Sequence, residues 1–237
     1  MKLSAPIYHL KRKAKRLSRD ENIPLHAALD RVALQEGYND WSLLASKLSA
    51  SSPAGKLLAR LKPGDLMLLA ARPGQGKTLM SLELAVEAMK AGNRAAFFTL
   101  EYTREDVLER FRAIGVEYAQ CEGLFEFDCS DAIGADYIME KLASAPRGTL
   151  VVVDYLQLLD QRRENPELAQ QVRALKAFAS DRGLIFVFIS QIDRSYDPLT
   201  KPCPDVRDVR LPNPLDLQVF NKTCFLNKGE LRFEAAA

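Results

Sequence analysis

The stretch Ala71-Arg-Pro-Gly-Gln-Gly-Lys-Thr78 decides how this sequence is expected to fold. It follows an apolar run, DLMLLAA (65–71), and precedes apolar residues at helical spacing over about 77–91. Glycines let a backbone curl so that its N–H groups face a phosphate, and the helix that follows adds the positive end of its dipole. A strand, a glycine-rich turn and a helix in this order predict a phosphate-binding loop.

The loop matches the pattern of Gly, four residues and Gly-Lys-Ser/Thr except at its first position, where Ala71 stands. In this pattern the Lys side chain, here Lys77, reaches the β- and γ-phosphates of a nucleotide. The hydroxyl, here that of Thr78, binds Mg²⁺. The sequence therefore predicts ATP and Mg²⁺ as cofactors. The residues expected to contact ATP are Arg72, Pro73, Gly74, Gln75, Gly76, Lys77, Thr78 and Leu79.

Further apolar runs alternate with helical patterns along the chain. Strands without polar alternation are typical of a parallel sheet that helices cover on both faces, so we expect an α/β fold with a mostly parallel sheet. The tail TCFLNKGELRF (223–233) predicts two short strands around a turn at 227–229. The other apolar runs are RAAFFTL (94–100), TLVVVDY (149–155) and LIFVFIS (184–190), and the other helical patterns lie at about 103–114, 131–144 and 166–182.

Three polar residues follow these apolar runs, and each has a functional and a plain interpretation. Asp154 ends one run, where a carboxylate either holds Mg²⁺ beside a phosphate-binding loop or caps a turn. Glu101 follows another, where it either deprotonates an attacking water or is an exposed loop acid. Gln191 follows a third, where its amide either senses the γ-phosphate or is a polar strand end.

Four segments together resemble the successive motifs of the motor domain of DnaB-like replicative helicases, which are RecA-type ATPases. The segments are AARPGQGKTLMSLELA, FFTLEYTREDVLER, LVVVDYLQLL and FISQIDRS, and the resemblance spans about residues 56–195. It implies a RecA-like fold and hydrolysis of ATP. It also implies the site roles, with Lys77 on phosphate, Thr78 and Asp154 on Mg²⁺, Glu101 as the catalytic base and Gln191 as the sensor.

The resemblance further implies partners. In this family the active site lies between subunits, so a homo-oligomer is expected. The segments that face single-stranded DNA correspond to 160–166 and 192–214. The second of these segments contains four basic residues, Arg194, Lys201, Arg207 and Arg210. The family's Lys-x-Arg pair, which reaches into the neighbouring site, has no match at the right spacing, and Lys228, Arg232 and Arg210 are the candidates for its role.

Residues 1–50 have a different character, with nine Lys or Arg against five Asp or Glu. Three short helices are expected at about 4–20, 25–36 and 41–48, and Asp40 is expected to cap the third. The stretch SASSPAG (49–55) indicates a linker, which divides the chain into a small basic helical module, 1–50, and an ATPase domain, 51–237. The basic first helix, with Ile7, Leu10, Ala14 and Leu17 on its apolar face, either contacts nucleic acid or is a solvated surface.

Composition bears on the location of the protein and on whether it spans a membrane. The net charge is +2, no Cys forms a CxxC pair, and no apolar run of 18 residues or secretory signal is found, so we expect a cytoplasmic protein without a membrane span. Three functions stay open. The first is a DNA-associated, DnaB-like ATPase, and the second is a KaiC-like regulatory switch with slow or no turnover. The third is a nucleotide-binding interaction protein.

Overall fold

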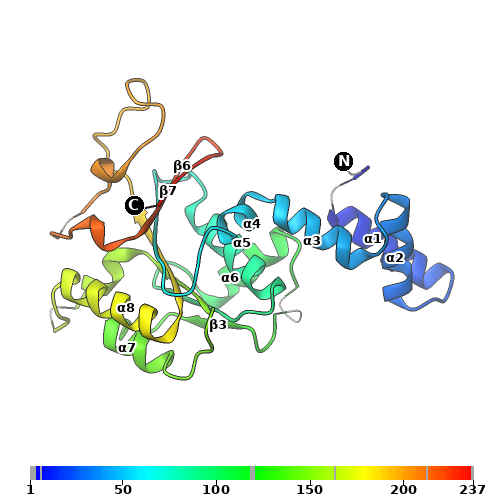
Figure 1. The fold of residues 1–237 in the computed structure, drawn as a ribbon, viewed down its shortest axis with the longest axis horizontal. Helices are drawn as coiled ribbons and strands as arrows, with labels where there is room; N and C mark the ends of the chain where they lie inside the picture. The colour runs from blue at the N-terminus through cyan, green and yellow to red at the C-terminus, as the bar shows by residue number, and fades with distance from the viewer. Residues whose placement is uncertain (1–3, 6, 118–120, 163, 212, 236–237) are drawn as a thin grey trace. The chain divides into compact units, whose positions relative to one another are not determined.

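The computed structural model describes residues 4–5, 7–117, 121–162, 164–211 and 213–235, without the side chains of 7, 8, 46 and 48–51. The chain forms two compact units, Met1–Lys56 and Leu57–Ala237 (Figure 1). No helix among the described residues combines the length and the hydropathy that a bilayer crossing requires.

The first unit is built from three helices. Leu10 and Ala14 of the first helix are buried against Ala28 and Val32 of the second, and the predicted apolar face is confirmed there, while the side chain of Ile7 lies outside the described residues. Trp41 is only partly buried and packs against both small apolar clusters of the unit. The helices are α1 (Ile7–Asp20), α2 (Leu25–Gln35) and α3 (Trp41–Ser51).

The stretch 49–55, predicted as a linker, is mostly helical, and the two units meet at 56/57, six residues beyond the predicted boundary of 50/51. Helix α3 continues to Ser51, and a further helix, α4 (Pro53–Leu58), begins two residues later. The side chain of Ser52 accepts a hydrogen bond from the N–H of Gly55 (2.9 Å), and Pro53 occupies the first helical position, where its missing N–H costs nothing. Ser52, one of the small polar residues that suggested a linker, acts here as a helix cap.

The second unit contains a seven-stranded sheet in the order β3-β2-β4-β5-β1-β6-β7. All neighbouring pairs are parallel except β6 and β7, which form an antiparallel hairpin. The predicted mostly parallel sheet and the terminal hairpin are confirmed. The strands are β1 (Leu66–Ala71), β2 (Ala95–Thr99), β3 (Phe125–Asp128), β4 (Leu150–Asp154), β5 (Ile185–Gln191), β6 (Lys222–Asn227) and β7 (Glu230–Ala235).

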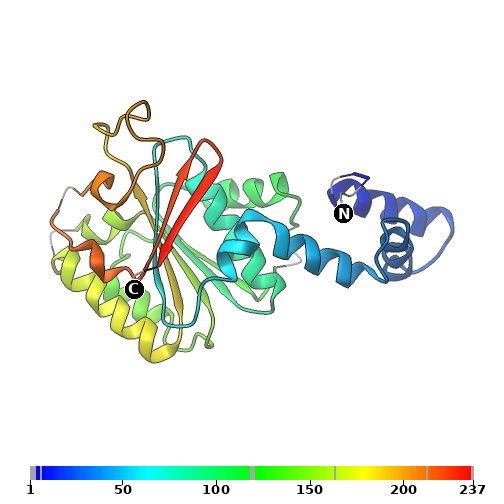
Figure 2. The same cartoon turned by 45° about the horizontal axis from the view of Figure 1, so that its top comes forward.

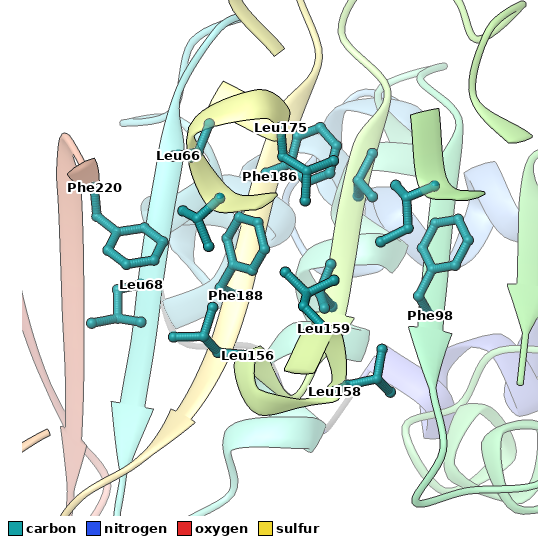
Figure 3. Packing of buried hydrophobic residues seen from close by; sticks show 14 of the residues in the cluster. Leu66, Leu68, Phe98, Leu156, Leu158, Leu159, Leu175, Phe186, Phe188 and Phe220 are labelled. Carbon is teal, nitrogen blue, oxygen red and sulfur yellow. The ribbon is translucent and has the colours of Figure 1, made fainter. Parts of the chain in front are cut away.

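Helices cover both faces of this sheet. On one face, a large apolar cluster includes Phe98, Phe186 and Phe188 from the strands together with Leu159 and Leu175 from covering helices (Figure 3). The central strands are buried along their whole length, which explains their uninterrupted apolar sequences. The helices are α5 (Lys77–Lys90), α6 (Arg104–Ala113), α7 (Ala135–Lys141) and α8 (Leu168–Arg182), with 3₁₀ turns at Leu156–Asp160, Val206–Asp208 and Leu217–Val219.

The edge strand β3 was not predicted from the sequence. It is four residues long, and only Phe125 is fully buried, because an edge strand keeps one side toward solvent. Helix α7 is also shorter than the predicted 131–144. Both differences lie at the margin of the sheet, and the buried central strands follow their predicted ranges closely.

Candidate active site

The phosphate-binding loop connects β1 to α5. Gly74 and Gly76 have positive φ angles of 76° and 84°, a conformation that residues with a side chain adopt rarely. Ala71, which replaces the usual first glycine, is the fully buried last residue of β1 and pairs with Gln191 and Leu226 of the neighbouring strands. An extended strand position does not require glycine, so the departure at Ala71 leaves the curl of the loop intact.

Lys77 is the first residue of α5, and its amine lies 3.4 Å from the backbone carbonyl of Arg72. Burial lowers the pKa of the Lys77 amine, while the nearby carboxylates of Asp154 and Glu101 act in the opposite direction. An anionic ligand beside Lys77 would favour its charged form in the same way that the two carboxylates do.

Thr78 and Asp154 come together although they are 76 residues apart. The Thr78 hydroxyl donates to the Asp154 carboxylate over 3.2 Å, and Asp154 is only 1% exposed. The pKa of Asp154 is raised to about 7, chiefly by burial and further by the charge of Glu101, against the opposing effects of the Thr78 hydrogen bond and of Lys77. A buried carboxylate beside a hydroxyl is an oxygen donor set of the kind that Mg²⁺ prefers, so these residues fit the metal.

Glu101 lies two residues beyond the end of β2, and its N–H donates to the Thr99 hydroxyl (3.0 Å). Its side chain is exposed and faces the same pocket as Asp154, whose pKa it raises. The next residue, Tyr102, is covered by the guanidinium of Arg110 at 4.1 Å from the ring centroid. This placement leaves Glu101 accessible to a water molecule in the pocket.

Gln191 is the last residue of β5, and its side chain also lines the pocket. Its backbone carbonyl accepts a hydrogen bond from the N–H of Arg210 (2.8 Å), so the strand end is attached to the segment that returns from 193–208. The preceding residue, Ser190, is fully buried, and its hydroxyl has no hydrogen-bond partner among the described residues.

One pocket of about 350 Å³ collects these groups at the carboxyl ends of the central strands. Nine of the eleven predicted site residues line it, and Arg72 and Gln75 do not. Gln75 turns away, and its side-chain oxygen accepts a hydrogen bond from the N–H of Lys228 (2.7 Å). The residues that line the pocket without having been predicted are Tyr102, Tyr155 and Ile189, and only Tyr102 and Tyr155 carried a signal, as neighbours of Glu101 and Asp154.

The candidate basic residues for a neighbouring site do not line this pocket. Lys228 lies in the turn between β6 and β7, and Arg232 forms an ion pair with Glu234 (2.6 Å). Arg210 is exposed next to the end of β5. Lys77 is therefore the only basic residue among the described residues that line the pocket.

The basic residues of the predicted DNA-contacting segments differ in their availability. Arg194 and Arg210 are exposed, whereas Lys201 and Arg207 both form ion pairs with Asp205 (2.8 and 2.7 Å). Positions 163 and 212, which belong to the predicted segments, lie outside the described residues. In the first unit, five cations of α1 are exposed. They are Arg12, Lys13, Lys15, Arg16 and Arg19.

Comparison with known proteins identifies relatives of this chain. A family model described as "ATPase: KaiC" matches residues 56–203. A "Probable plasmid replicative DNA helicase" of Chlamydia trachomatis is 27% identical over 210 residues, which are 74% of this chain and 45% of that protein. The "Replicative DNA helicase DnaB" of Pasteurella multocida is 27% identical over 226 residues, 78% of this chain and 47% of that protein. The chain thus spans less than half the length of these curated relatives.

Two solved structures share the fold. One, described as an ATPase domain, superimposes with a TM-score of 0.60 at 18% identity, covering 78% of this chain and 81% of that chain. A DnaB-like replicative helicase, solved to describe its interactions with primase, also gives a TM-score of 0.60 at 18% identity, covering 92% of this chain and 66% of that chain. The expected RecA-like fold is confirmed.

Proposed function

The chain belongs to the KaiC-type ATPase family, and from this premise we propose that it binds ATP with Mg²⁺ in the pocket at the strand ends and hydrolyses it. One observation carries the proposal: Thr78 and Asp154 meet at 3.2 Å beside Lys77, in a loop whose glycines expose its backbone. A phosphate group and a divalent cation are the ligands that this combination of amide, amine, hydroxyl and carboxylate recognises.

The loop and Lys77 would hold the phosphates. The N–H groups around Gly74 and Gly76 and the first turn of α5 present a positive potential, to which Lys77 adds a full charge. The same groups would stabilise the charge that builds up on the phosphate oxygens during transfer, because they are fixed in place before the reaction begins.

Thr78 and Asp154 would hold the Mg²⁺. A bound cation favours the ionised form of the Asp154 carboxylate, whose pKa is raised to about 7, chiefly by burial. When bound, the metal supplies charge neutralisation at the β- and γ-phosphates. The Thr78 hydroxyl and the Asp154 carboxylate orient it, because the end of β4 and the start of α5 fix both groups.

Glu101 and Gln191 would act at the γ-phosphate end of the pocket. Glu101 is exposed to the pocket and would orient the attacking water and accept its proton. Gln191 lies across the pocket on β5 and would contact the γ-phosphate through its amide. Its backbone bond to Arg210 gives a direct connection from this contact to the 193–208 segment.

We further propose association with single-stranded DNA, assembly of several copies and a cytoplasmic location. The relatives that are named as replicative helicases support this interpretation, as do the exposed Arg194 and Arg210 near the pocket and the exposed cations of α1. An assembly would also supply what a single chain lacks among its described residues, a second basic residue at the pocket.

A second candidate function is a nucleotide switch with slow turnover. It is favoured because Lys77 is the single basic residue among the described residues that line the pocket. Without an additional cation, phosphoryl transfer of this type is slower by about 10³–10⁵-fold. Addition of DNA distinguishes the two functions, since a DNA-dependent motor is stimulated by DNA and a slow switch is not.

Steady-state hydrolysis of ATP by the full chain, with and without single-stranded DNA, tests the proposal. Replacing Lys77→Ala is expected to lower turnover by about 10²–10³-fold, the effect of removing one fixed charge-stabilising donor. The matched control is Lys62→Ala, an exposed lysine outside the pocket, which should leave turnover unchanged. Equal turnover in the Lys77→Ala variant and the unmodified chain would refute the assignment of this pocket.

A further inference from the structure

The segment 193–208, which follows β5, is folded and held closed at its base. Ile192 and Val209 pair as an antiparallel bridge, and the N–H of Asp193 donates to the carbonyl of Asp208 (2.7 Å). Ile192 and Val209 are both buried in the main apolar cluster of the unit. The chain therefore leaves the sheet and returns to it at one point, and we refer to residues 193–208 as the excursion.

Contacts inside the excursion give it a defined shape. Tyr196 is 5% exposed, and its hydroxyl donates to the carbonyl of Lys201 (2.7 Å). Lys201 pairs with Asp205 (2.8 Å), which is the N-cap of the 3₁₀ turn Val206–Asp208, and with Asp208 at the end of that turn. Asp197 adds a turn at the tip, where its carbonyl accepts hydrogen bonds from the N–H of Lys201 (3.1 Å) and from the Thr200 hydroxyl (3.1 Å). The excursion is therefore internally hydrogen-bonded.

The turn of the β6–β7 hairpin lies against the phosphate-binding loop (Figure 2). Lys228 and Gly229 both have positive φ angles, 49° and 82°, as in the tight two-residue turns that connect antiparallel strands. The last paired residues of the hairpin are Asn227 and Glu230, so the N–H of Lys228 points outside the ladder. That N–H donates to the side-chain oxygen of Gln75 (2.7 Å).

The same turn also contacts the excursion. The side-chain amide of Asn227 donates to the backbone carbonyl of Pro202 (2.6 Å). Two hydrogen bonds therefore connect the phosphate-binding loop to the excursion. One joins Gln75 to Lys228, and the other joins the adjacent Asn227 to Pro202.

The position of Gln75 makes this connection sensitive to a bound phosphate. Gly74 and Gly76, on either side, line the pocket, while the side chain of Gln75 is directed to the hairpin. A phosphate bound by the loop would fix the backbone on both sides of Gln75, and with it the acceptor that holds the turn. This route is separate from the one through the backbone hydrogen bond between Gln191 and Arg210.

We propose that Asn227 is a positioning residue that, through Lys228 and Gln75, couples the occupancy of the phosphate-binding loop to the order of the excursion. The proposal rests on the proposed binding of ATP. Its consequence is that the excursion becomes more ordered when nucleotide is bound, and that this change depends on the side-chain amide of Asn227.

Hydrogen–deuterium exchange of the full chain, with and without a non-hydrolysable ATP analogue and Mg²⁺, tests the coupling. In the unmodified chain the analogue is expected to slow exchange of the 193–208 amides by about 2- to 12-fold, which corresponds to one ordinary hydrogen bond. The variants Asn227→Ala and Asn227→Asp both lose the donor, and in both the analogue should no longer slow exchange there. Because coupling between two events is reciprocal, titration of a fluorescent analogue should show weaker binding to both variants, by at most the same factor of about 2- to 12-fold.

Two further comparisons separate coupling from simple destabilisation. Thr200→Ala removes a hydrogen bond within the excursion (3.1 Å) that does not involve the hairpin, so exchange should rise equally with and without the analogue. Gln75→Glu keeps an acceptor for Lys228 and should retain the dependence, whereas Gln75→Ala should lose it. Full dependence in Asn227→Ala and Asn227→Asp would overturn the proposal. The proposal would also be overturned if bound analogue left the exchange of 193–208 unchanged in the unmodified chain. If the analogue did not bind at all, the proposed function would be overturned as well.

Discussion

The two units of this chain use charged residues in opposite ways. In the second unit a few charged groups are placed at or just beyond the ends of buried strands, and Asp154, at the end of β4, is only 1% exposed. In the first unit, α1 keeps Leu10 and Ala14 for a small core and exposes five cations to solvent. We propose that the charges of the second unit act in the chemistry of the pocket and that those of the first unit make contacts.

The physical reason for the contrast is the surrounding medium. Electrostatic interactions inside a protein pocket are several times stronger than in water, so one fixed group there alters a reaction barrier strongly. Exposed cations are screened within about 8 Å at physiological salt, so they act as a set and their effect depends on ionic strength. The four predictions below test this contrast with effects of decreasing size.

Replacing Glu101→Gln should have the largest effect. The substitution removes the group proposed to accept the proton of the attacking water, and turnover is expected to fall by about 10²–10⁴-fold. Nucleotide affinity should change little, because Glu101 is exposed and the phosphate contacts come from the loop and Lys77. Steady-state hydrolysis and a nucleotide titration measure the two quantities separately.

The matched control for this variant is Glu105→Gln, an exposed acid in the first turn of α6 that does not line the pocket. It should leave turnover unchanged. If Glu101→Gln and Glu105→Gln behave alike, Glu101 is an ordinary loop acid, and the contrast between the units then rests on Lys77, Thr78 and Asp154 alone.

Replacing Leu44→Ala tests the independence of the two units. Leu44 is fully buried in the first unit, and removal of a buried leucine side chain costs about 2–5 kcal/mol. A unit of this size has little stability to spare, so residues 7–56 should become sensitive to limited proteolysis. Hydrolysis of ATP should persist, because Leu57–Ala237 has its own core and contains the whole pocket. Loss of hydrolysis together with the first unit would contradict the division.

Neutralising α1 tests the contact role of exposed charge. Replacing Arg12, Lys15, Arg16 and Arg19 together by Gln should reduce the salt dependence of binding to an oligothymidylate. The slope of log K against log salt should change by up to about 3, since each phosphate contact on a single strand contributes about 0.7. Arg31→Gln is the control, because Arg31 is paired with Glu21. An unchanged slope in the fourfold variant would mean that α1 is a solvated surface.

These predictions depend on features that the sequence reveals unequally. The mostly parallel sheet, the alternation of strands and helices along the chain, and the convergence of Lys77, Glu101, Asp154 and Gln191 could be predicted, because buried parallel strands appear as apolar runs and their carboxyl ends share one edge. The pattern failed where burial is partial, as at β3, whose alternating sequence FEFD gives a weak signal over four residues.

The helix at 53–58 and the role of Gln75 could not be predicted for a different reason. Both depend on hydrogen bonds of side chains that have several possible uses. Ser52 resembles a linker residue until its hydroxyl is seen to accept from Gly55. Gln75 resembles a phosphate contact until its oxygen is seen to accept from Lys228, which is 153 residues away. Neither use leaves a periodic pattern in the sequence.

The smallest expected effect compares one kind of interaction in both units. Asp40 accepts a hydrogen bond from the N–H of Leu43 (2.7 Å) at the start of α3, and Thr103 accepts one from Asp106 (3.2 Å) at the start of α6. Removing either cap, by Asp40→Ala or Thr103→Ala, should cost about 1 kcal/mol. The same loss should be visible in the first unit as faster exchange of its amides. In the second unit, whose larger core leaves more stability in reserve, exchange of the strand amides should change little.

Asp40→Asn keeps an acceptor and should restore the exchange rates of the first unit, which distinguishes the cap from an effect of charge. If Asp40→Ala and Thr103→Ala instead raised exchange equally throughout the chain, the two units would unfold as one. The small unit would then owe its stability to the ATPase unit, and its exposed cations would be part of the same cooperative structure as the pocket. Unequal responses would mean that the first unit, which contains α1, folds independently. It could then be destabilised without a change in the chemistry at Asp154.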